Sequence, residues 1–192
     1  MARPLAVAIT GGIGAGKSAA LEAFARRGIP TLSSDEIVHR LLRADDEVRT
    51  GVTERFGPGV ADDRSKLGSL VFGDPEALAW LEALLHPRVV REYVSWREEL
   101  GRGADPPRVV VVEVPLLYET CGEARFDRVV AITAPRDVRA RRAKVSLDGR
   151  EERLLSDDEK VRRADFAYVN DGSLDALDEF VGSVVARLGV AA

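Results

Sequence analysis

The sequence predicts an α/β protein in which helices cover both faces of a five-stranded parallel sheet. Patterns typical of helices separate most of the expected strands, and this alternation favours a parallel sheet. Residues 109–112 are four consecutive valines, as expected for a strand that is buried on both faces. We therefore expect a three-layer α/β/α fold. The strands are expected at residues 5–10, 29–32, 108–114, 127–133 and 167–170.

Helices are expected on either side of the second strand. Residues 16–27 form the first, which ends at Gly28 because glycine readily adopts the backbone conformation of a helix C-terminus. The second begins at Ser33, since Ser33 and Glu36 have the spacing of a capping box.

Residues 33–107 separate the second and third strands and are far longer than a crossover between parallel strands requires. Apolar residues recur there at helical spacing, so we expect a helical insertion. An insertion at the carboxyl ends of parallel strands lies where open α/β sheets bind their ligands. The expected buried positions are Leu67, Leu70 and Val71, then Leu78, Leu81, Leu84 and Leu85, then Val89, Val90, Tyr93 and Val94.

The dipeptide His86-Pro87 interrupts this helical pattern. Proline disrupts helix interiors, so the dipeptide predicts a turn between two helices. Contact with a substrate is the alternative role for His86. The helix before it is expected to start at Asp74 and Pro75, as N-cap and first helical residue.

The 192 residues are expected to form a single domain, because domains of this size are common and neither a repeat nor a low-complexity linker divides the chain. Ser173 begins a closing amphipathic helix over residues 174–188. The expected parts are a core (residues 1–34, 106–135 and 164–192), a helical insertion (35–105) and a short lid (136–163).

Charge and composition exclude several classes of protein. The chain has 28 basic and 32 acidic residues, a net charge opposite to that of a dedicated nucleic-acid binder. No apolar run exceeds five residues, against roughly 18 for a membrane span, so we expect no membrane partner. Cys121 is the only cysteine, which excludes an internal disulfide and fits the cytoplasm. We expect a cytoplasmic monomer.

A phosphate-binding loop directly follows the first strand. Residues 11–18 match G-x-x-x-x-G-K-[ST] in full and directly precede a helix. Backbone N–H groups of such a loop point at phosphate oxygens, Lys17 reaches the β and γ phosphates, and Ser18 binds Mg²⁺. The residues expected to bind the nucleotide are Gly11, Gly12, Ile13, Gly14, Ala15, Gly16, Lys17, Ser18 and Ala19.

Two other interpretations of this loop fit less well. A dinucleotide-binding loop needs G-x-G-x-x-G, and Lys17 stands where its last glycine would be. A glycine-rich turn with a chance lysine remains the alternative, although the order of strand, loop and helix disfavours it.

Two acidic residues at strand ends are candidates for chemistry. Asp35 follows the second strand and could orient or deprotonate an acceptor hydroxyl; it could equally be an acid that the helix dipole favours. Glu113 ends the valine-rich strand and could hold a water on Mg²⁺, or be a strand-end acid without a role.

Residues 136–153 hold six arginines and Lys144 against four acidic residues. Such a segment could close over a triphosphate, and a solvated helix face is the simpler alternative. The aromatic residues Tyr93, Trp96 and Tyr118 are expected in the core.

The chain resembles the dephospho-CoA kinase family. The resemblance is carried by LAVAITGGIGAGKS at residues 5–18, Asp35, DRSKLGSLVF at 63–72, LEALLHPRV at 81–89, VPLLYE at 114–119 and ADFAYVNDGS at 164–173. The phosphate loop is common to many nucleotide-binding proteins, whereas the HP and VPLLYE stretches in this order are more specific.

The resemblance implies transfer of the γ-phosphoryl group of MgATP to the ribose 3′-hydroxyl of dephospho-CoA. The insertion would bind the CoA portion and an arginine-bearing lid would close over ATP. Asp35 would be the base. The implied catalytic residues are Lys17, Asp35, Arg141 and Arg150, the substrate-binding residues Asp35, His86 and Glu119, and the metal-binding residues Ser18 and Glu113.

The chain departs from the family pattern at several positions. Ser33 stands where the family has an aspartate, His39 where an arginine is common, and Ala19 where a threonine often follows the serine. The lid between Arg142 and Arg150 is several residues shorter than usual, and Leu154 replaces a glutamine. The roles of Arg141 and Arg150 therefore rest on a lid that differs in length from that of the family.

Two other functions compete with this one. Another small-molecule kinase of the same fold, acting on a nucleoside monophosphate or a sugar acid, would share the phosphate loop. A GTP-dependent switch would need N-K-x-D to bind guanine, and Asn170 is followed by Asp171 and Gly172 instead.

Overall fold

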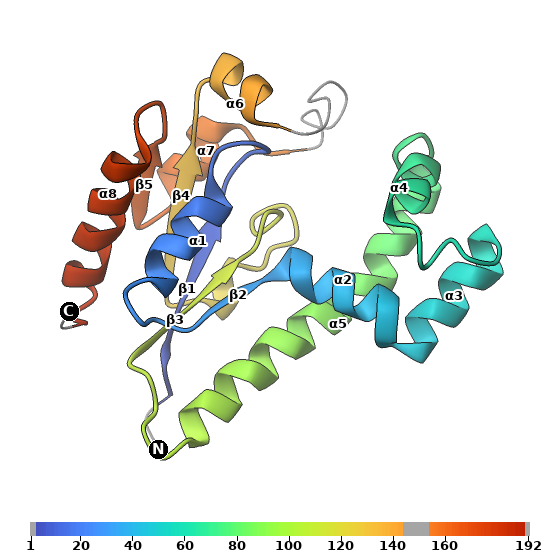
Figure 1. Cartoon of the computed structure of the whole chain (residues 1–192), viewed down its shortest axis with the longest axis horizontal. Coiled ribbons are helices and arrows are strands. Elements are labelled where there is room, and N and C mark those ends of the chain that lie inside the picture. Colours follow the sequence, from blue (N-terminus) through green and yellow to red (C-terminus); the bar gives the residue numbers. More distant parts are fainter. Residues whose placement is uncertain (1–2, 144–153, 191–192) are drawn as a thin grey trace. The chain divides into compact units, whose positions relative to one another are not determined.

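A computed structural model describes residues 3–143 and 154–190 of the chain (Figure 1). The chain divides into two compact units, one formed by Met1–Ser33 with Arg97–Ala192 and the other by Ser34–Trp96. We call the first the core unit and the second the helical unit, and describe each by itself.

The core unit contains a five-stranded sheet in the order β2-β3-β1-β4-β5. All neighbouring strands pair in parallel. All five predicted strands are confirmed, with ends that differ from the predicted ones by at most two residues. The strands are β1 (Leu5–Thr10), β2 (Thr31–Ser33), β3 (Val109–Glu113), β4 (Arg128–Thr133) and β5 (Phe166–Val169).

The register brings the carboxyl ends of the inner strands to one edge of the sheet. Ile9 near the end of β1 pairs with Glu113 at the end of β3, and Ser33 at the end of β2 pairs with Glu113 as well. Any loop that leaves these strands therefore starts at the same edge, where open α/β sheets place their ligands.

One face of the sheet is covered by α1 (Lys17–Ala25) and α8 (Leu174–Arg187). Phe24 of α1 and Val181 of α8 are fully buried in one apolar cluster with sheet residues such as Ile132. As predicted, Ser173 begins the closing helix: its hydroxyl accepts a hydrogen bond from the Ala176 N–H.

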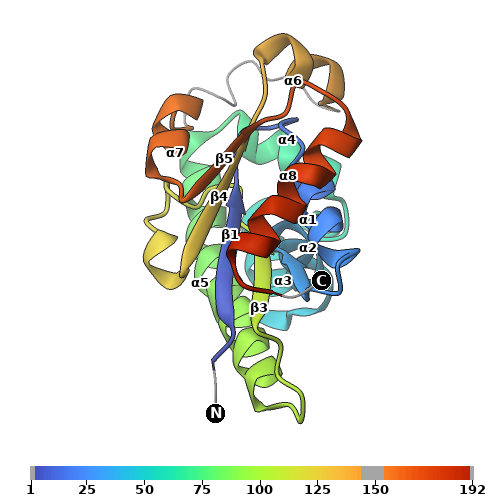
Figure 2. The ribbon, with the colours of Figure 1, turned by 90° about the vertical axis from the view of Figure 1, so that its left-hand side faces the viewer.

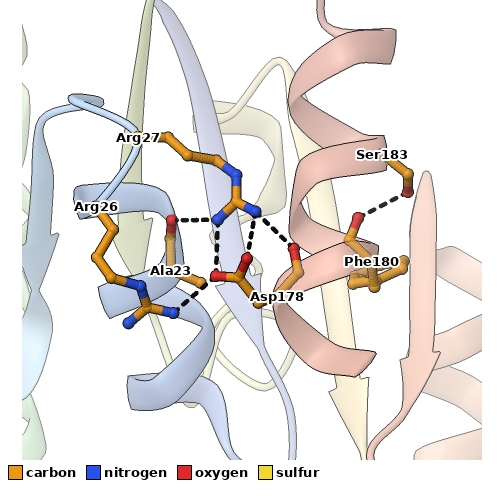
Figure 3. A network of polar contacts seen from close by, with 6 residues as sticks. All are labelled: Ala23, Arg26, Arg27, Asp178, Phe180 and Ser183. Carbon is orange, nitrogen blue, oxygen red and sulfur yellow. Dashed lines mark hydrogen bonds and ion pairs between the residues drawn. The ribbon is translucent and has the colours of Figure 1, made fainter. Parts of the chain in front are cut away.

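An ion-pair network joins the C-terminal end of α1 to α8 (Figure 3). Arg27 donates to both carboxylate oxygens of Asp178 and to the Asp178 carbonyl, and Arg26 donates to the same carboxylate. These hydrogen bonds, first from Arg27 and then from Arg26, hold the pKa of Asp178 well below its usual range.

The opposite face is covered by α7 (Asp157–Arg163) and the loop after β3, so the sheet has a layer on each side (Figure 2). Leu117 and Tyr118 of that loop pack with Ala8 and Val129 of the sheet. The core unit also contains α6 (Arg136–Arg142) and a 3₁₀ turn, η1 (Glu123–Arg125).

The helical unit is built from α2 (Ser34–Ala44), α3 (Asp46–Phe56), α4 (Arg64–Phe72) and most of α5 (Pro75–Arg102). Aspartates begin three of these helices: Asp45 accepts from Val48 N–H, Asp63 from Lys66 N–H, and Asp74 from Glu76 and Ala77 N–H. Each satisfies backbone donors of a first helical turn. The predicted helical insertion and the start at Asp74 and Pro75 are confirmed.

Four local predictions were wrong. Ser33 is the last residue of β2, and α2 begins at Ser34, so the strand continues one residue further than the capping-box pattern suggested. Leu70 and Val94, both expected on buried faces, are 41% and 38% exposed. His86-Pro87 is no turn, because α5 continues through Pro87 to Arg102.

The continuity of α5 has a physical reason. Proline lacks an N–H and costs a helix interior about 3 kcal/mol. Leu81, Leu85, Val89 and Tyr93 follow one another every four residues on one face, and all four are buried. Burying such side chains contributes roughly 1.5 to 3 kcal/mol each, so the continuous apolar face outweighs the proline.

Within the described ranges, no helix is both long enough and apolar enough to cross a bilayer.

Candidate active site

The phosphate loop is a tight connection between β1 and α1, and it depends on glycine. At Gly11 the backbone has φ 149°, and a Cβ there would lie 1.9 Å from the Ile132 carbonyl oxygen of β4. At Gly16, the N-cap of α1, φ is 102°. Side chains at either position would collide with neighbours or strain the backbone, so the loop can adopt this tight curve only with glycine at these positions.

Lys17 is the first residue of α1 and extends back over the loop. Its ammonium Nζ donates to the Gly12 carbonyl oxygen at 3.0 Å. This contact places the charge of Lys17 beside backbone N–H groups at a helix N-terminus, which is the arrangement that binds phosphate. The predicted strand, loop and helix context of the motif is confirmed.

Ser18 and Glu113 lie together at the same edge. The Ser18 hydroxyl lies 3.4 Å from Glu113 Oε2 and 3.5 Å from Oε1. Glu113 is only 4% exposed, at the end of β3. A hydroxyl and a carboxylate are hard oxygen ligands of the kind that Mg²⁺ prefers, so the two residues fit the ion.

The described residues contain no cluster of three or more His, Cys, Asp or Glu side chains that could hold a metal. Mg²⁺ in phosphoryl-transfer sites is typically bound by only one or two protein groups together with waters and substrate phosphates, so a Ser18–Glu113 pair is compatible with it.

Arg139 of α6 lies directly over the phosphate loop. A Cβ at Gly12 would lie 3.2 Å from Arg139 Nη1, and one at Gly14 would lie 2.7 Å from the Arg139 carbonyl oxygen. The Arg139 side chain is 11% exposed; its Nε donates to the Ala134 carbonyl, and its Nη2 lies 3.7 Å from Asp157. It lines a cavity of about 200 Å³ with Gly12, Leu154, Leu155, Ser156 and Asp157.

Arg141 is placed quite differently from Arg139. Its side chain is 68% exposed and pairs with Asp137 one turn earlier in α6, at 2.8 Å. This matches the solvated helix face that was the alternative for the lid arginines. Arg150, the other arginine assigned to the lid, lies outside the described residues.

Glu119 and Lys160 form a buried ion pair behind this cavity. Lys160 of α7 is fully buried, and its Nζ lies 2.9 Å from Glu119 Oε1, in an approach too oblique for a hydrogen bond. The same oxygen accepts from the Leu155 N–H at 3.0 Å. Glu119 therefore holds the segment that lines the cavity, a role different from the substrate contact that the resemblance implied.

Asp35 and His86 belong to the helical unit. Asp35 is an exposed acid in the first turn of α2, two residues after Ser33. His86 lies half-buried in α5, where burial lowers its pKa and Glu82 opposes that shift.

Sequence reasoning missed Arg139 and Asn170. The arginine-rich segment was identified, but its composition does not show which arginine turns toward the loop. Asn170 follows β5 directly and is 3% exposed beside the phosphate loop. The rule that selected Asp35 and Glu113, polar residues at strand ends, would also have found Asn170.

A parallel sheet in this order, with a glycine loop and its lysine between β1 and α1, defines a P-loop nucleotide-binding protein. Comparison with known proteins narrows this class. The model of the dephospho-CoA kinase family matches residues 5–176, and the chain belongs to that family. Kinases of this family use ATP as phosphoryl donor.

Individual relatives agree with this assignment. The dephospho-CoA kinase of Mesorhizobium japonicum is 36% identical, with 96% of each chain covered. That of Brucella melitensis is 34% identical over 96% of this chain and 95% of the relative.

Solved structures confirm the fold. The dephospho-CoA kinase of Campylobacter jejuni is 27% identical and superposes with a TM-score of 0.64 over 97% of this chain and 98% of that one. Shikimate kinase of Acinetobacter baumannii is 14% identical, with a TM-score of 0.51 over 98% and 96%, and is similar in fold alone.

Proposed function

We propose that the chain transfers the γ-phosphoryl group of ATP to the ribose 3′-hydroxyl of dephospho-CoA and so forms coenzyme A. The observation that carries the chemistry is the phosphate loop with Lys17, and the Ser18–Glu113 pair beside it. Membership of the dephospho-CoA kinase family supports dephospho-CoA as the acceptor.

Within the core unit, residues 11–19 bind the ATP phosphates through backbone N–H groups and the Lys17 ammonium. These groups stabilise charge on the transferring phosphoryl group, which is the main task in a reaction with a loose transition state. Ser18 and Glu113 would hold Mg²⁺, Glu113 through a water. Bound there, the ion would neutralise charge on the phosphate oxygens.

The helical insertion expected over residues 35–105, most of which belongs to the helical unit, contributes the acceptor site. Asp35 accepts the hydrogen of the 3′-hydroxyl and holds its oxygen in line with the γ-phosphorus. His86 contacts dephospho-CoA, as the resemblance implies, and its partial burial in α5 lowers the pKa of its imidazole.

The lid residues remain part of the proposal. Arg150 would contact the triphosphate as part of the lid, whereas Arg141, exposed and paired with Asp137, would lie on the solvated face of α6. Arg139 already lies at the phosphate loop. We further propose that the enzyme works as a cytoplasmic monomer, since the described residues of the phosphate site, Lys17, Ser18, Glu113 and Arg139, all lie in one core unit.

The decisive experiment compares acceptors. ADP release from ATP is measured with dephospho-CoA, AMP and pantothenate in parallel, and Lys17→Ala serves as the control. Of the three acceptors, we expect only dephospho-CoA to support turnover. In the Lys17→Ala control the rate should fall on the order of 10²-fold, because one electrostatic stabiliser is removed. Turnover with AMP and none with dephospho-CoA would replace the proposed acceptor.

A further inference from the structure

Asn170 connects three parts of the core unit around the phosphate loop. Its backbone N–H donates to the Thr133 carbonyl at 2.7 Å, and its carbonyl accepts from Arg142 Nη1 at 2.9 Å. Its side-chain Nδ2 donates to the Ala15 carbonyl at 2.8 Å. The residue is only 3% exposed. Because hydrogen bonds hold its backbone N–H and its carbonyl, its side-chain amide is directed at the phosphate loop.

The contact with the loop is close enough to restrict its sequence. A Cβ on Gly16 would lie 2.2 Å from Asn170 Nδ2, well inside van der Waals contact. Gly16 already has a left-handed backbone, at φ 102°. The Asn170 amide therefore packs against both residues that precede Lys17.

The orientation of one peptide group follows from this contact. The Ala15 carbonyl and the Gly16 N–H belong to the same planar trans peptide, in which they point in opposite directions. When Asn170 holds the Ala15 oxygen, the Gly16 N–H is turned away from Asn170. Without the amide, the Ala15–Gly16 peptide could rotate, and a buried carbonyl would lose its partner.

We propose that Asn170 is a positioning residue that fixes the Ala15–Gly16 peptide and so keeps the phosphate loop in its binding form. It touches neither phosphate nor acceptor in this role. The proposal rests on the proposed use of the loop for ATP phosphates and is independent of which acceptor the enzyme takes.

Two variants separate hydrogen bonding from packing. Asn170→Ala removes the amide and leaves space, whereas Asn170→Leu keeps the branched shape without a donor and without a charge. If Asn170 acts through its N–H, both variants weaken binding of phosphate, because a buried carbonyl left without its partner has a substantial cost. If it acts only by filling space, the Asn170→Leu variant retains the binding that the Asn170→Ala variant loses.

Binding is measured by calorimetry with ADP and, separately, with inorganic triphosphate, at a temperature well below the melting temperature of each variant. We expect the Kd for both ligands to rise by about 10-fold or more in both variants, the size of one lost buried hydrogen bond. Asp171→Ala, at an exposed neighbouring position, is the matched control and should leave both Kd values unchanged.

The outcomes against the proposal are specific. Binding within threefold of wild type in Asn170→Leu would show a packing role only. A loss for ADP with triphosphate unaffected would place Asn170 at the nucleoside. Because neither ligand involves the acceptor, a failure of dephospho-CoA as substrate would leave these results interpretable.

Discussion

Ser18 Oγ lies 3.4 Å from Glu113 Oε2, which brings the first turn of α1 to the carboxyl end of β3. The two residues are 95 positions apart in the chain, and the parallel pairing of β1 with β3 is what joins them. A hydroxyl and a nearly buried carboxylate at this point form a site for a hard cation beside the phosphate loop.

Glu113→Gln tests that interpretation. The amide keeps the size and one oxygen of the carboxylate but removes its charge, so Mg²⁺ should be held more weakly. We expect the Mg²⁺ concentration for half-maximal turnover to rise by about 10-fold or more, as for loss of a group that supports a metal. ADP binding in the absence of Mg²⁺, followed by calorimetry, should not change. An unaltered Mg²⁺ dependence would assign Glu113 to structure alone.

Arg139 and Arg141 form a matched pair on one short helix. Arg139 is nearly buried against the phosphate loop and the cavity beside it, whereas Arg141 is mostly exposed. We expect Arg139→Ala to lower kcat/KM for ATP on the order of 10²-fold and Arg141→Ala to lower it by less than about threefold, because only the first removes a charge held at the phosphate site.

Steady-state kinetics with ATP varied at saturating acceptor would measure both effects, and circular dichroism would check that α6 persists. The reverse order of the two losses would mean that the lid arginine expected from the family resemblance, Arg141, acts after closure and that Arg139 serves only to pack α6.

The strands and the phosphate loop were predictable because their signals are local. Residues 109–112 are apolar without alternation, and the glycines of the phosphate loop themselves permit its backbone geometry. The site needed one more step, the rule that parallel strands end at one edge. That rule selected Glu113, the motif selected Ser18, and the structure brings the two side chains together.

What the sequence could not show depends on long-range packing. Pro87 is accepted inside α5 because a buried face extends on both sides of it, which no dipeptide pattern reveals. Arg139 and Arg141 are two residues apart and alike in composition, and only the contact of α6 with the loop distinguishes them. Likewise, the partner of Glu119 is a lysine 41 positions later.

Removing either charge of the buried Glu119–Lys160 pair alone should destabilise the core unit, because the other charge is then left buried without its partner. Lys160 is fully buried, so Lys160→Met leaves the Glu119 carboxylate without its cation. Breaking one partner of a buried pair costs roughly 3 to 5 kcal/mol, and we expect a loss of that order in urea unfolding.

The double variant Lys160→Met with Glu119→Gln is the control. It removes the charge that Lys160→Met leaves behind and keeps an oxygen for the Leu155 N–H. We expect it to recover most of the stability. A double variant less stable than the single one would show that the two charges are not coupled.

Stability at acid pH should depend on Asp178. Arg27 and Arg26 hold its pKa well below the ordinary value, so its contribution is present above the unfolded pKa of about 3.9 and is lost as the pH falls further. Asp178→Asn should therefore lower the melting temperature at pH 7, and the difference from wild type should shrink below about pH 4. A difference that persists unchanged to pH 3 would exclude the ion pairs of Figure 3 as its source.

Asp35→Asn distinguishes a catalytic carboxylate from a helix-favouring acid. Asparagine has the same size and can still accept a hydrogen bond at the start of α2. If Asp35 only interacts with the helix dipole, the variant loses at most about 1 kcal/mol of stability and keeps near-normal turnover. If Asp35 accepts the 3′-hydroxyl hydrogen, kcat falls roughly 10² to 10⁴-fold.

Glu36→Gln is the matched control, because Glu36 is the other exposed acid in the same helical turn. Both variants lose one charge at the same helix end, so a dipole effect would be equal in the two, whereas a role in catalysis affects Asp35 alone.

The measurement is kcat together with the Kd for dephospho-CoA, since a base can be removed without loss of binding. An Asp35→Asn variant that binds dephospho-CoA normally and turns over within about fivefold of wild type would overturn the assignment, because general-base catalysis contributes more than that. A flat pH profile in wild type would not, since a loose transition state requires little early proton transfer and leaves Asp35 its orienting role.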